Sequence, residues 1–445
     1  MFDSLLYKSS PFFIQSLLIT IRALIRRMIR DNGATKKLFK QIEEHERSAK
    51  ALNSYVQKSL RHAIGNAVSN VEFYSKLGLA NSANLDQFGF ITKDDVRSNP
   101  DSFKSSVEPR IIVNGSTSGT SGAPLLVPQS LGSVIREQAF VARMLKWCGF
   151  EKGDKRAWLR GDMMVPIAQS KPPYWRYSWC ENMIMLSSFH MSKEALPLYI
   201  EAMVNYGVDV IQAYPSSIVT LAKYLESVKQ YYPGSLKSIV TSSETLSCED
   251  RQLIEQRFRC KVFDWYGLFE RVAAIANCEH GRYHVLSDYS FVEFLSVGNG
   301  LHEIVGTNFN NHYFPLIRYR TGDLVVFSGE NQCPCGRVFP IVEKVVGRMN
   351  SDDYVYGSNG AKISALGDCL KGVIGLIDAQ FVQEKVGEVD VLVLVNELFD
   401  FKQQAILLSN VRNRLGKGVT VRLKKVEKLL RTNSAKQPRA ICNVD

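Results

Sequence analysis

The chain has 445 residues, of which 45% are hydrophobic, and this composition excludes a disordered chain and a polytopic membrane protein. Its net charge is +11, and residues 1–61 hold twelve basic and five acidic residues, so that +7 lies in this first stretch. An acidic partner is therefore expected there, either membrane phospholipid or another polyanion. The nine scattered cysteines do not suggest a disulfide framework, and with no apparent secretory signal they favour the cytoplasm.

Residues 11–30 predict a basic amphipathic helix that begins at Pro11. Its uncharged run ends at Arg22, well short of the roughly 20 residues that cross a bilayer. Four arginines would spread over one broad side, opposite leucines and isoleucines: Arg22, Arg26, Arg27 and Arg30. This pattern is typical of a helix that lies on an anionic membrane surface. The alternative is a helix that packs on the protein's own core and presents an ordinary solvated face.

Further helices are expected at residues 34–70 and 131–147. In the middle of the chain, short apolar runs alternate with amphipathic segments. Examples are the expected strand 209–214, helix 216–230 and strand 238–241. This alternation predicts a layered α/β fold.

Glycines cluster with Asp and Asn residues around residues 346–360, where a domain boundary is expected. The remaining segment contains an expected strand at 389–395, a helix at 401–415 and a strand at 419–426, which together predict a small α+β domain. The expected organisation is a basic helical segment at 1–60, a large domain at 61–348 and a small C-terminal domain at 349–445.

Residues 114–124 read Asn-Gly-Ser-Thr-Ser-Gly-Thr-Ser-Gly-Ala-Pro and form the most informative motif of the chain. The glycines allow the backbone to approach a ligand closely, and successive N–H groups with Ser and Thr hydroxyls can bind an anion such as a triphosphate. No Gly-Lys-Ser/Thr closes the run, which argues against a Walker A loop. The alternative is a flexible linker.

Two later motifs combine turns with carboxylates. Residues 263–270, Phe-Asp-Trp-Tyr-Gly-Leu-Phe-Glu, supply a flat aromatic wall for a nucleoside and end in a carboxylate suited to Mg²⁺. Residues 317–324, Ile-Arg-Tyr-Arg-Thr-Gly-Asp-Leu, place an Asp on a glycine turn, where it can accept hydrogen bonds from both ribose hydroxyls. Taken singly, each motif has the alternative of an ordinary strand and turn.

In this order, the three motifs resemble the phosphate loop, the Tyr-Gly-x-x-Glu motif and the Tyr-Arg-Thr-Gly-Asp-Leu motif of the adenylate-forming superfamily. With Val346-Gly347-Arg348 following, the resemblance covers roughly residues 60–445. Enzymes of this superfamily use ATP to convert a carboxylate into an acyl-adenylate, with release of pyrophosphate. The resemblance implies a large N-terminal adenylate-forming domain of layered α/β structure and a small mobile C-terminal α+β domain.

The resemblance also implies roles for individual residues. Glu270 would hold Mg²⁺, Asp323 would bind the ribose, and Arg348 would assist from the domain boundary. Thr117 is assigned to catalysis together with Glu270. The residues expected around the triphosphate of ATP are Ser116, Thr117, Ser118, Gly119, Thr120 and Gly122. Those expected beside adenine are Ser243, Glu244, Asp264 and Tyr266.

Residues 430–439, Leu-Arg-Thr-Asn-Ser-Ala-Lys-Gln-Pro-Arg, resemble the C-terminal Pro-Arg-Thr-x-x-Gly-Lys-x-x-Arg motif of the superfamily. Lys436 then corresponds to the catalytic lysine, a mobile cation that neutralises charge at the carboxylate oxygen and the α-phosphate. The alternative is a solvated basic tail. The chain departs from the family pattern at Ala435, which replaces a glycine, and at Asn350, which replaces a hinge aspartate.

Cysteines and histidines cluster in residues 278–284 and 333–337, and they could supply four soft ligands for tetrahedral zinc. Unrelated cysteines are the alternative, because the spacing is not that of a standard finger. A resemblance to the phenylacetate–CoA ligase-like branch favours a structural zinc site, with the ligands Cys278, His284, Cys333 and Cys335. His280 stays open as a replacement for His284.

The segment Pro-Phe-Phe-Ile-Gln-Ser-Leu-Leu-Ile-Thr-Ile, together with the downstream motifs, resembles CapK-type proteins of capsule and surface-polysaccharide gene clusters. The expected function is ATP- and Mg²⁺-dependent activation of a carboxylic acid, followed by transfer to CoA, a carrier thiol or an amino sugar, in the cytoplasm near the inner membrane face. The alternative is a catalytically weak, membrane-associated scaffold of a polysaccharide assembly complex. Nucleic acid is not an expected partner, because no recognition motif accompanies the basic charge.

Overall fold

The chain folds into two compact units, which a computed structural model describes except at a few positions. The first unit comprises Met1–Leu24, Lys152–Val262 and Ser351–Asp445, and the second comprises Ile25–Glu151 and Phe263–Asn350. The structure describes residues 2, 4–117, 125–327, 329, 332–348, 353–363, 366–370, 372–416, 418–432 and 434–444. Ser118, Gly119, Thr120, Gly122 and Asn350 therefore lie outside the described residues.

Helices dominate the N-terminal part of the chain. They are α1 (Leu5–Ser9), α2 (Phe12–Arg30), α3 (Gly33–His45), α4 (Ala49–Asn70), α5 (Glu72–Ser75), α6 (Lys93–Ser98) and α7 (Leu131–Trp147), with 3-10 turns at Leu85–Gln87 and Pro100–Phe103. The single helix expected at 34–70 is in fact two, because Ser48 caps a new helix by accepting a hydrogen bond from the Ala51 N–H. Within the described part of the chain, no helix combines the length and the apolar character needed to cross a membrane.

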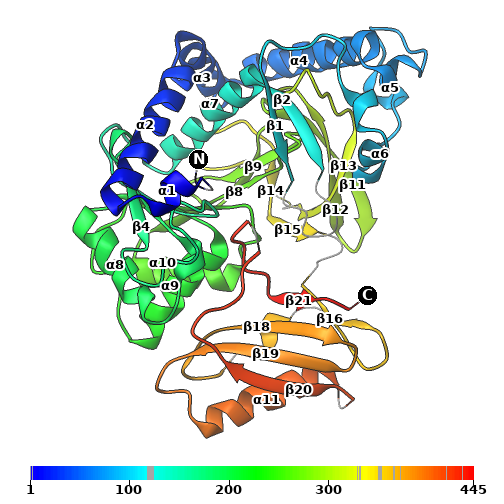
Figure 1. Ribbon diagram of the computed structural model, residues 1–445. Helices are drawn as coiled ribbons and strands as arrows, with labels where there is room; N and C mark the ends of the chain where they lie inside the picture. The colour runs from blue at the N-terminus through cyan, green and yellow to red at the C-terminus, as the bar shows by residue number, and fades with distance from the viewer. Residues whose placement is uncertain are drawn as a thin grey trace. The chain divides into compact units, whose positions relative to one another are not determined.

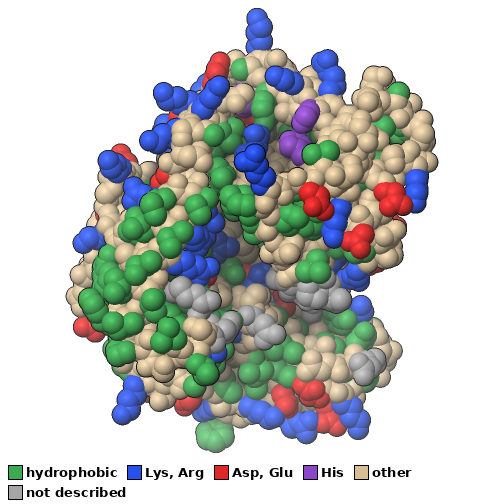
Figure 2. All heavy atoms as spheres, turned by 45° about the horizontal axis from the view of Figure 1, so that its top comes forward, with side chains coloured by type: hydrophobic (Ala, Val, Ile, Leu, Met, Phe, Trp, Pro, Cys, Tyr) green, Lys and Arg blue, Asp and Glu red, His purple; other side chains and the backbone are tan. Residues whose placement is uncertain are grey.

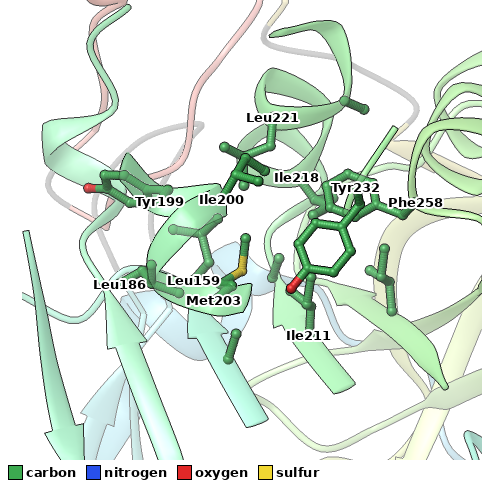
Figure 3. Close-up of a cluster of buried hydrophobic side chains, with 14 of the residues drawn as sticks. Leu159, Leu186, Tyr199, Ile200, Met203, Ile211, Ile218, Leu221, Tyr232 and Phe258 are labelled. Carbon is green, nitrogen blue, oxygen red and sulfur yellow. The ribbon is translucent and has the colours of Figure 1, made fainter. Parts of the chain in front are cut away.

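The first unit contains a mostly parallel sheet with the strand order β7-β6-β3-β5-β4. Its strands are β3 (Arg156–Leu159), β4 (Trp175–Ser178), β5 (Met183–Leu186), β6 (Val210–Ala213) and β7 (Ser238–Ser242). Its helices are α8 (Ala195–Tyr206), α9 (Pro215–Ser227) and α10 (Cys248–Phe258), with 3-10 turns at Trp179–Glu181 and Ser188–His190. Leu159 and Ile211 from the strands meet Ile218 from α9 in the buried core (Figure 3). The expected α/β layering is confirmed.

The C-terminal part of the first unit is an α+β domain, as expected. Its main sheet has the order β20-β19-β18-β21, and α11 lies along one face of it (Figure 1). Leu407 and Val411 of α11 belong to the same buried cluster as Val391 of β19. The elements are β16 (Val355–Tyr356), β17 (Lys362–Ile363), β18 (Leu376–Lys385), β19 (Glu388–Val395), α11 (Phe401–Leu415), β20 (Thr420–Lys425) and β21 (Ala440–Cys442), with a 3-10 turn at Leu366–Leu370.

The second unit is rich in antiparallel strands. A hairpin joins β1 (Ile112–Ser116) to β2 (Leu126–Ser130), and two further groups have the orders β14-β10-β9-β8 and β11-β12-β13-β15. The bounds in the first group are β8 (Lys261–Gly267), β9 (Ala274–Asn277), β10 (Tyr283–Val285) and β14 (Ile341–Val342). Those in the second group are β11 (Ser290–Gly298), β12 (Leu301–Asn308), β13 (Tyr319–Val326) and β15 (Lys344–Arg348).

Candidate functional site

The β1–β2 hairpin carries the run of hydroxyls and glycines at its tip. Ser116 pairs with Leu126, and the Thr117 N–H donates to the Leu125 carbonyl over 3.0 Å. The Leu125 N–H donates in turn to Thr117 Oγ1, also over 3.0 Å. Thr117 thus uses its backbone and its hydroxyl to close the base of the loop, whose residues 118–124 lie outside the described part.

The hairpin lies directly against the turn that carries Glu270. A Cβ atom at Gly115 would collide with the ring of Phe269, so a larger residue there would have to displace that ring. On β2, Gln129 donates to the Phe269 carbonyl and accepts from the Arg271 guanidinium. The base of the predicted triphosphate loop and the predicted magnesium ligand are therefore neighbours in one unit.

Glu270 is a buried carboxylate with 6% of its surface exposed. Burial raises its pKa, and the hydrogen bond from Tyr319 Oη, 3.2 Å from Glu270 Oε1, opposes that rise together with the charges of Lys93 and Arg348. A divalent cation at this carboxylate would strongly favour its charged form. The residues present therefore fit the role of a Mg²⁺ ligand.

Asp323 lies within β13, at a bulge where the pairing of β13 with β12 shifts in register. Gly322 adopts a φ of +74°, and Asp323 accepts a hydrogen bond from Tyr266 Oη over 2.8 Å. The Arg348 guanidinium lies 3.7 Å from the other carboxylate oxygen, because β15 pairs with β13 at this position. The structure thus brings Asp323, Tyr266 and Arg348 together, three residues that sequence motifs had singled out separately.

Asp264 lies on β8 two residues before Tyr266 and is also buried. Its carboxylate accepts a hydrogen bond from Tyr283 Oη over 3.2 Å, and its N–H is bonded to the side chain of Asn277. These contacts hold Asp264 of β8 against Asn277 of β9 and Tyr283 of β10.

In the first unit, Lys436 sits on a tight turn that Thr432 closes. The Thr432 N–H donates to the Lys436 carbonyl, and the Lys436 N–H donates to Thr432 Oγ1. Between them Ala435 has a φ of +60°, the left-handed region that favours glycine. The turn therefore explains why the family motif has glycine at the position of Ala435.

Partly buried Arg431 anchors this turn by donating to Ser217 Oγ and to the Ala435 carbonyl. Asp378 of β18 anchors the segment after it by accepting from Lys223 of α9 and from Arg439. Burial opposes ionisation of Asp378, but these two cations hold its pKa below the usual value. The Arg-Thr pair of the C-terminal motif indicated the contact that Arg431 makes with the turn. No local sequence pattern indicated the role of Asp378.

Glu244 lies beside the same turn. Its carboxylate accepts from Ser216 and from the Gln437 N–H, and burial raises its pKa against the opposing charges of Arg431 and Lys436. Neighbouring Ser243 has a φ of +72° and accepts a hydrogen bond from Arg160 over 2.7 Å. Ser243, Glu244 and the Lys436 turn thus converge within the first unit.

Three thiols and one imidazole gather elsewhere in the second unit. The ligand atoms of Cys278, His284, Cys333 and Cys335 all lie within 4.8 Å of one another, and this cluster contains His284 and not His280. The Cys278 and Cys333 sulfurs are 3.6 Å apart, and Cys335 Sγ is 3.4 Å from His284 Nε2. Tetrahedral zinc places its ligand atoms about 3.4–3.8 Å apart, and these two separations fall within that range.

The surroundings of the cluster favour the metal-binding forms of His284 and Cys335, whereas burial raises the pKa of Cys278 and raises that of Cys333 to about 12, so an ion would have to displace the protons of these two thiols. Burial and the nearby charge of Arg337 lower the pKa of His284 to about 4, which keeps the imidazole neutral. Burial opposes ionisation of Cys335, but the Arg337 N–H, 3.5 Å from its sulfur, and the Arg337 charge bring its pKa below the usual value. Deprotonated thiols and a neutral imidazole are the forms that coordinate zinc.

Comparisons with known proteins find relatives along the whole chain. A family model, the CapK C-terminal domain, matches residues 355–443. The chain is 25% identical to Protein CapK of Staphylococcus aureus over 452 residues, which covers 99% of both chains. It is also 25% identical to phenylacetate-coenzyme A ligase of Pseudomonas putida over 70% of this chain and 74% of that enzyme.

Among solved structures, 2-hydroxyisobutyryl-CoA ligase in the postadenylation state has the same fold. The TM-score is 0.63 at 17% identity, over 89% of this chain and 90% of that one. The structure of the same ligase in complex with 2-HIB-AMP gives a TM-score of 0.62 at 18% identity, with the same coverage. The chain is therefore similar along its whole length to CapK and over 70% of its length to a phenylacetate-coenzyme A ligase, and it shares its fold with a 2-hydroxyisobutyryl-CoA ligase.

Proposed function

We propose that the protein activates a carboxylic acid with ATP and Mg²⁺, and then transfers the acyl group to a thiol or an amine. The observation that carries this proposal is the gathering of Thr117, Glu270, Tyr319 and Asp323 within one unit of an adenylate-forming fold. CoA is one candidate acceptor, because a 2-hydroxyisobutyryl-CoA ligase of the same fold has been solved with 2-HIB-AMP and CoA. A carrier thiol and an amino sugar are the other candidate acceptors.

The chemistry needs charge stabilisation more than proton transfer. A carboxylate oxygen attacks the α-phosphorus of ATP, the bond from that phosphorus to the bridging oxygen breaks, and pyrophosphate leaves with the electron pair. Mg²⁺ at Glu270 would neutralise charge on the phosphates, and Asp323 would fix the nucleoside through its ribose hydroxyls. The Lys436 ammonium would stabilise the carboxylate and α-phosphate as they approach one another.

Exchange of labelled pyrophosphate into ATP tests the proposal directly. We expect purified protein to catalyse Mg²⁺-dependent exchange with at least one acid from a panel of amino, hydroxy, aryl and fatty acids. If no acid supports exchange and the protein does not bind ATP, the enzyme hypothesis fails and the scaffold alternative stands.

Lys436→Ala should lower the rate of adenylation by roughly 100-fold, because it removes a cation aimed at charge that develops in the transition state. Transfer from preformed acyl-adenylate should change much less, since a lysine on a mobile domain acts in one orientation only. Lys424→Ala, which removes an exposed lysine of β20 paired with Asp390, is the matched control. An adenylation rate within about twofold of the unsubstituted protein would refute the assignment of Lys436.

We also propose that helices α1 and α2 bind an anionic membrane surface. The helix α2 turns its polar side inward, where Gln15 bonds to Arg176 and Ser16 accepts from the Tyr177 N–H. Eight of its large apolar side chains are 38–66% exposed, whereas Ile19 is buried: the exposed ones are Phe13, Ile14, Leu17, Ile21, Leu24, Ile25, Met28 and Ile29. Figure 2 shows one face of the molecule, on which hydrophobic side chains (green) are exposed beside lysines and arginines (blue). A helix that packed its apolar side on the protein's own core would leave fewer of these side chains exposed.

Co-sedimentation with vesicles tests this surface. Each basic residue near an anionic leaflet contributes roughly 1 kcal/mol, and apolar side chains add insertion into the headgroup boundary. We expect binding to anionic vesicles to weaken as salt rises and to fall sharply when Leu17, Leu24 and Met28 are replaced by glutamine. Equal sedimentation of both proteins would contradict the membrane proposal, and loss of a dimer on substitution would assign the face to a second copy of the chain.

A further inference from the structure

Lys93 is a half-buried lysine that none of the sequence motifs includes. It is the first residue of α6, which begins there because Thr92 and Asp95 form a capping box. Its ammonium group makes no ion pair within 4.0 Å with the described residues. A partly desolvated cation without a counter-ion is unfavourable unless a ligand supplies the missing negative charge.

The backbone directs Lys93 to the Glu270 site. The Ile91 N–H donates to the Arg318 carbonyl over 3.1 Å, and the Arg320 N–H donates to the Ile91 carbonyl over 2.8 Å, so this segment pairs with the start of β13. Between those two partners lies Tyr319, whose hydroxyl donates to Glu270. Lys93 follows Ile91 by two residues and therefore stands at the same end of β13.

The electrostatics give independent support for this placement. Burial lowers the pKa of Lys93, the positive charge of Arg348 lowers it further, and the carboxylate of Glu270 opposes both. Lys93 in turn acts on the pKa of Glu270, as does Arg348. The charges of Lys93 and Arg348 thus both act on Glu270, while Arg348 also lies 3.7 Å from the Asp323 carboxylate. Arg348 therefore has Asp323 as a counter-ion, and Lys93 is the cation beside Glu270 that an anionic ligand could engage.

We propose that Lys93 binds the β- and γ-phosphates of ATP, and the pyrophosphate that they become. This proposal rests on the function proposed above. A triphosphate chelated to Mg²⁺ keeps net negative charge, which the Lys93 ammonium would balance next to the base of the Thr117 loop. When the bond from the α-phosphorus to the bridging oxygen breaks, negative charge grows on the leaving pyrophosphate. The ammonium stabilises that charge without giving up its proton.

The experiment compares ligands that contain these phosphates with one that lacks them. For Lys93→Met, the KM values for ATP and for pyrophosphate in the exchange reaction should rise roughly 10- to 100-fold, as expected for loss of a hydrogen bond between charged groups. The dissociation constant for AMP should stay within about twofold, because AMP has no β- or γ-phosphate. Lys93→Arg should restore most of the affinity for pyrophosphate, since it keeps the charge.

Lys104→Met is the matched control, because Lys104 is paired with Asp101 and does not act on Glu270. A second measurement needs no substitution: Mg²⁺-pyrophosphate should protect Lys93 from acetylation in the unmodified protein, and AMP should not. The proposal would be overturned by unchanged KM values for ATP and pyrophosphate in Lys93→Met, or by equal losses of affinity for ATP and AMP. It would also be overturned if Mg²⁺-pyrophosphate failed to protect Lys93 from acetylation. Exchange by the unmodified protein tests the enzyme function separately, so the two failures are distinguishable.

Discussion

Replacing Glu270 by alanine is expected to abolish acyl-adenylate formation, with a loss of more than about 1,000-fold, while the fold survives. The carboxylate is buried beside Tyr319 near the base of the proposed triphosphate loop, where it would hold the divalent cation that neutralises the phosphates. Without it, Mg²⁺-ATP would lose both affinity and orientation. The measurement is pyrophosphate exchange together with Mg²⁺-dependent ATP binding by calorimetry.

The variant Glu270→Gln removes the negative charge but keeps the size of the side chain, so it separates the effect of charge from the loss of packing in Glu270→Ala. Its amide can still accept the hydrogen bond from Tyr319, and burial raises the pKa of Glu270, so a neutral side chain is tolerated there. We therefore expect normal thermal stability with the same loss of exchange. Glu72→Gln, which alters an exposed carboxylate paired with Lys76, should behave as the unsubstituted protein. Full exchange activity in Glu270→Gln would remove Glu270 from the magnesium site.

Much of the fold could be predicted because local signals agreed with the tertiary structure. The helix expected at 131–147 matches α7, whose start is fixed by Ser130 as a side-chain cap. The strand expected at 389–395 matches β19 closely, because alternating valines there pack under α11. The helix expected at 34–70 was wrong in one respect, since the cap at Ser48 outweighed the helical periodicity on either side.

Other features depend on contacts between distant parts of the chain. The sequence did not distinguish His280 from His284, because the choice depends on β10, which pairs with β14 and brings His284 to the thiols. Lys93 was missed for the same reason: it approaches Glu270 only because Ile91 bridges to Tyr319. In α2 the amphipathic pattern was evident, but which side would face the protein was decided by the polar partners of Gln15 and Ser16.

Removal of the zinc that we propose for the four-ligand cluster is expected to destabilise the protein severely. The ligands come from two knuckles with glycines in the left-handed region, Gly281 and Gly336, and from a short strand, so little hydrophobic core holds them in place. Structural zinc contributes about 10–16 kcal/mol in zinc-finger peptides, and in a domain with its own core several kcal/mol of that should remain. Four protein ligands leave no open position, which makes the ion structural.

Freshly purified protein should therefore contain one zinc per chain by elemental analysis. Cys333→Ser should lose the metal and lower the midpoint of thermal unfolding, because serine is a poor zinc ligand and leaves Cys278 without its neighbour at 3.6 Å. Cys248→Ser, at an exposed cysteine at the start of α10, controls for the loss of a thiol and should change neither quantity. A strong chelator should reproduce the loss of stability in the unsubstituted protein and leave Cys333→Ser unaffected. A zinc content well below one per chain, with chelators excluded from purification, would contradict the assignment. The three thiols and the imidazole would then be held close together by the packing of the surrounding chain alone.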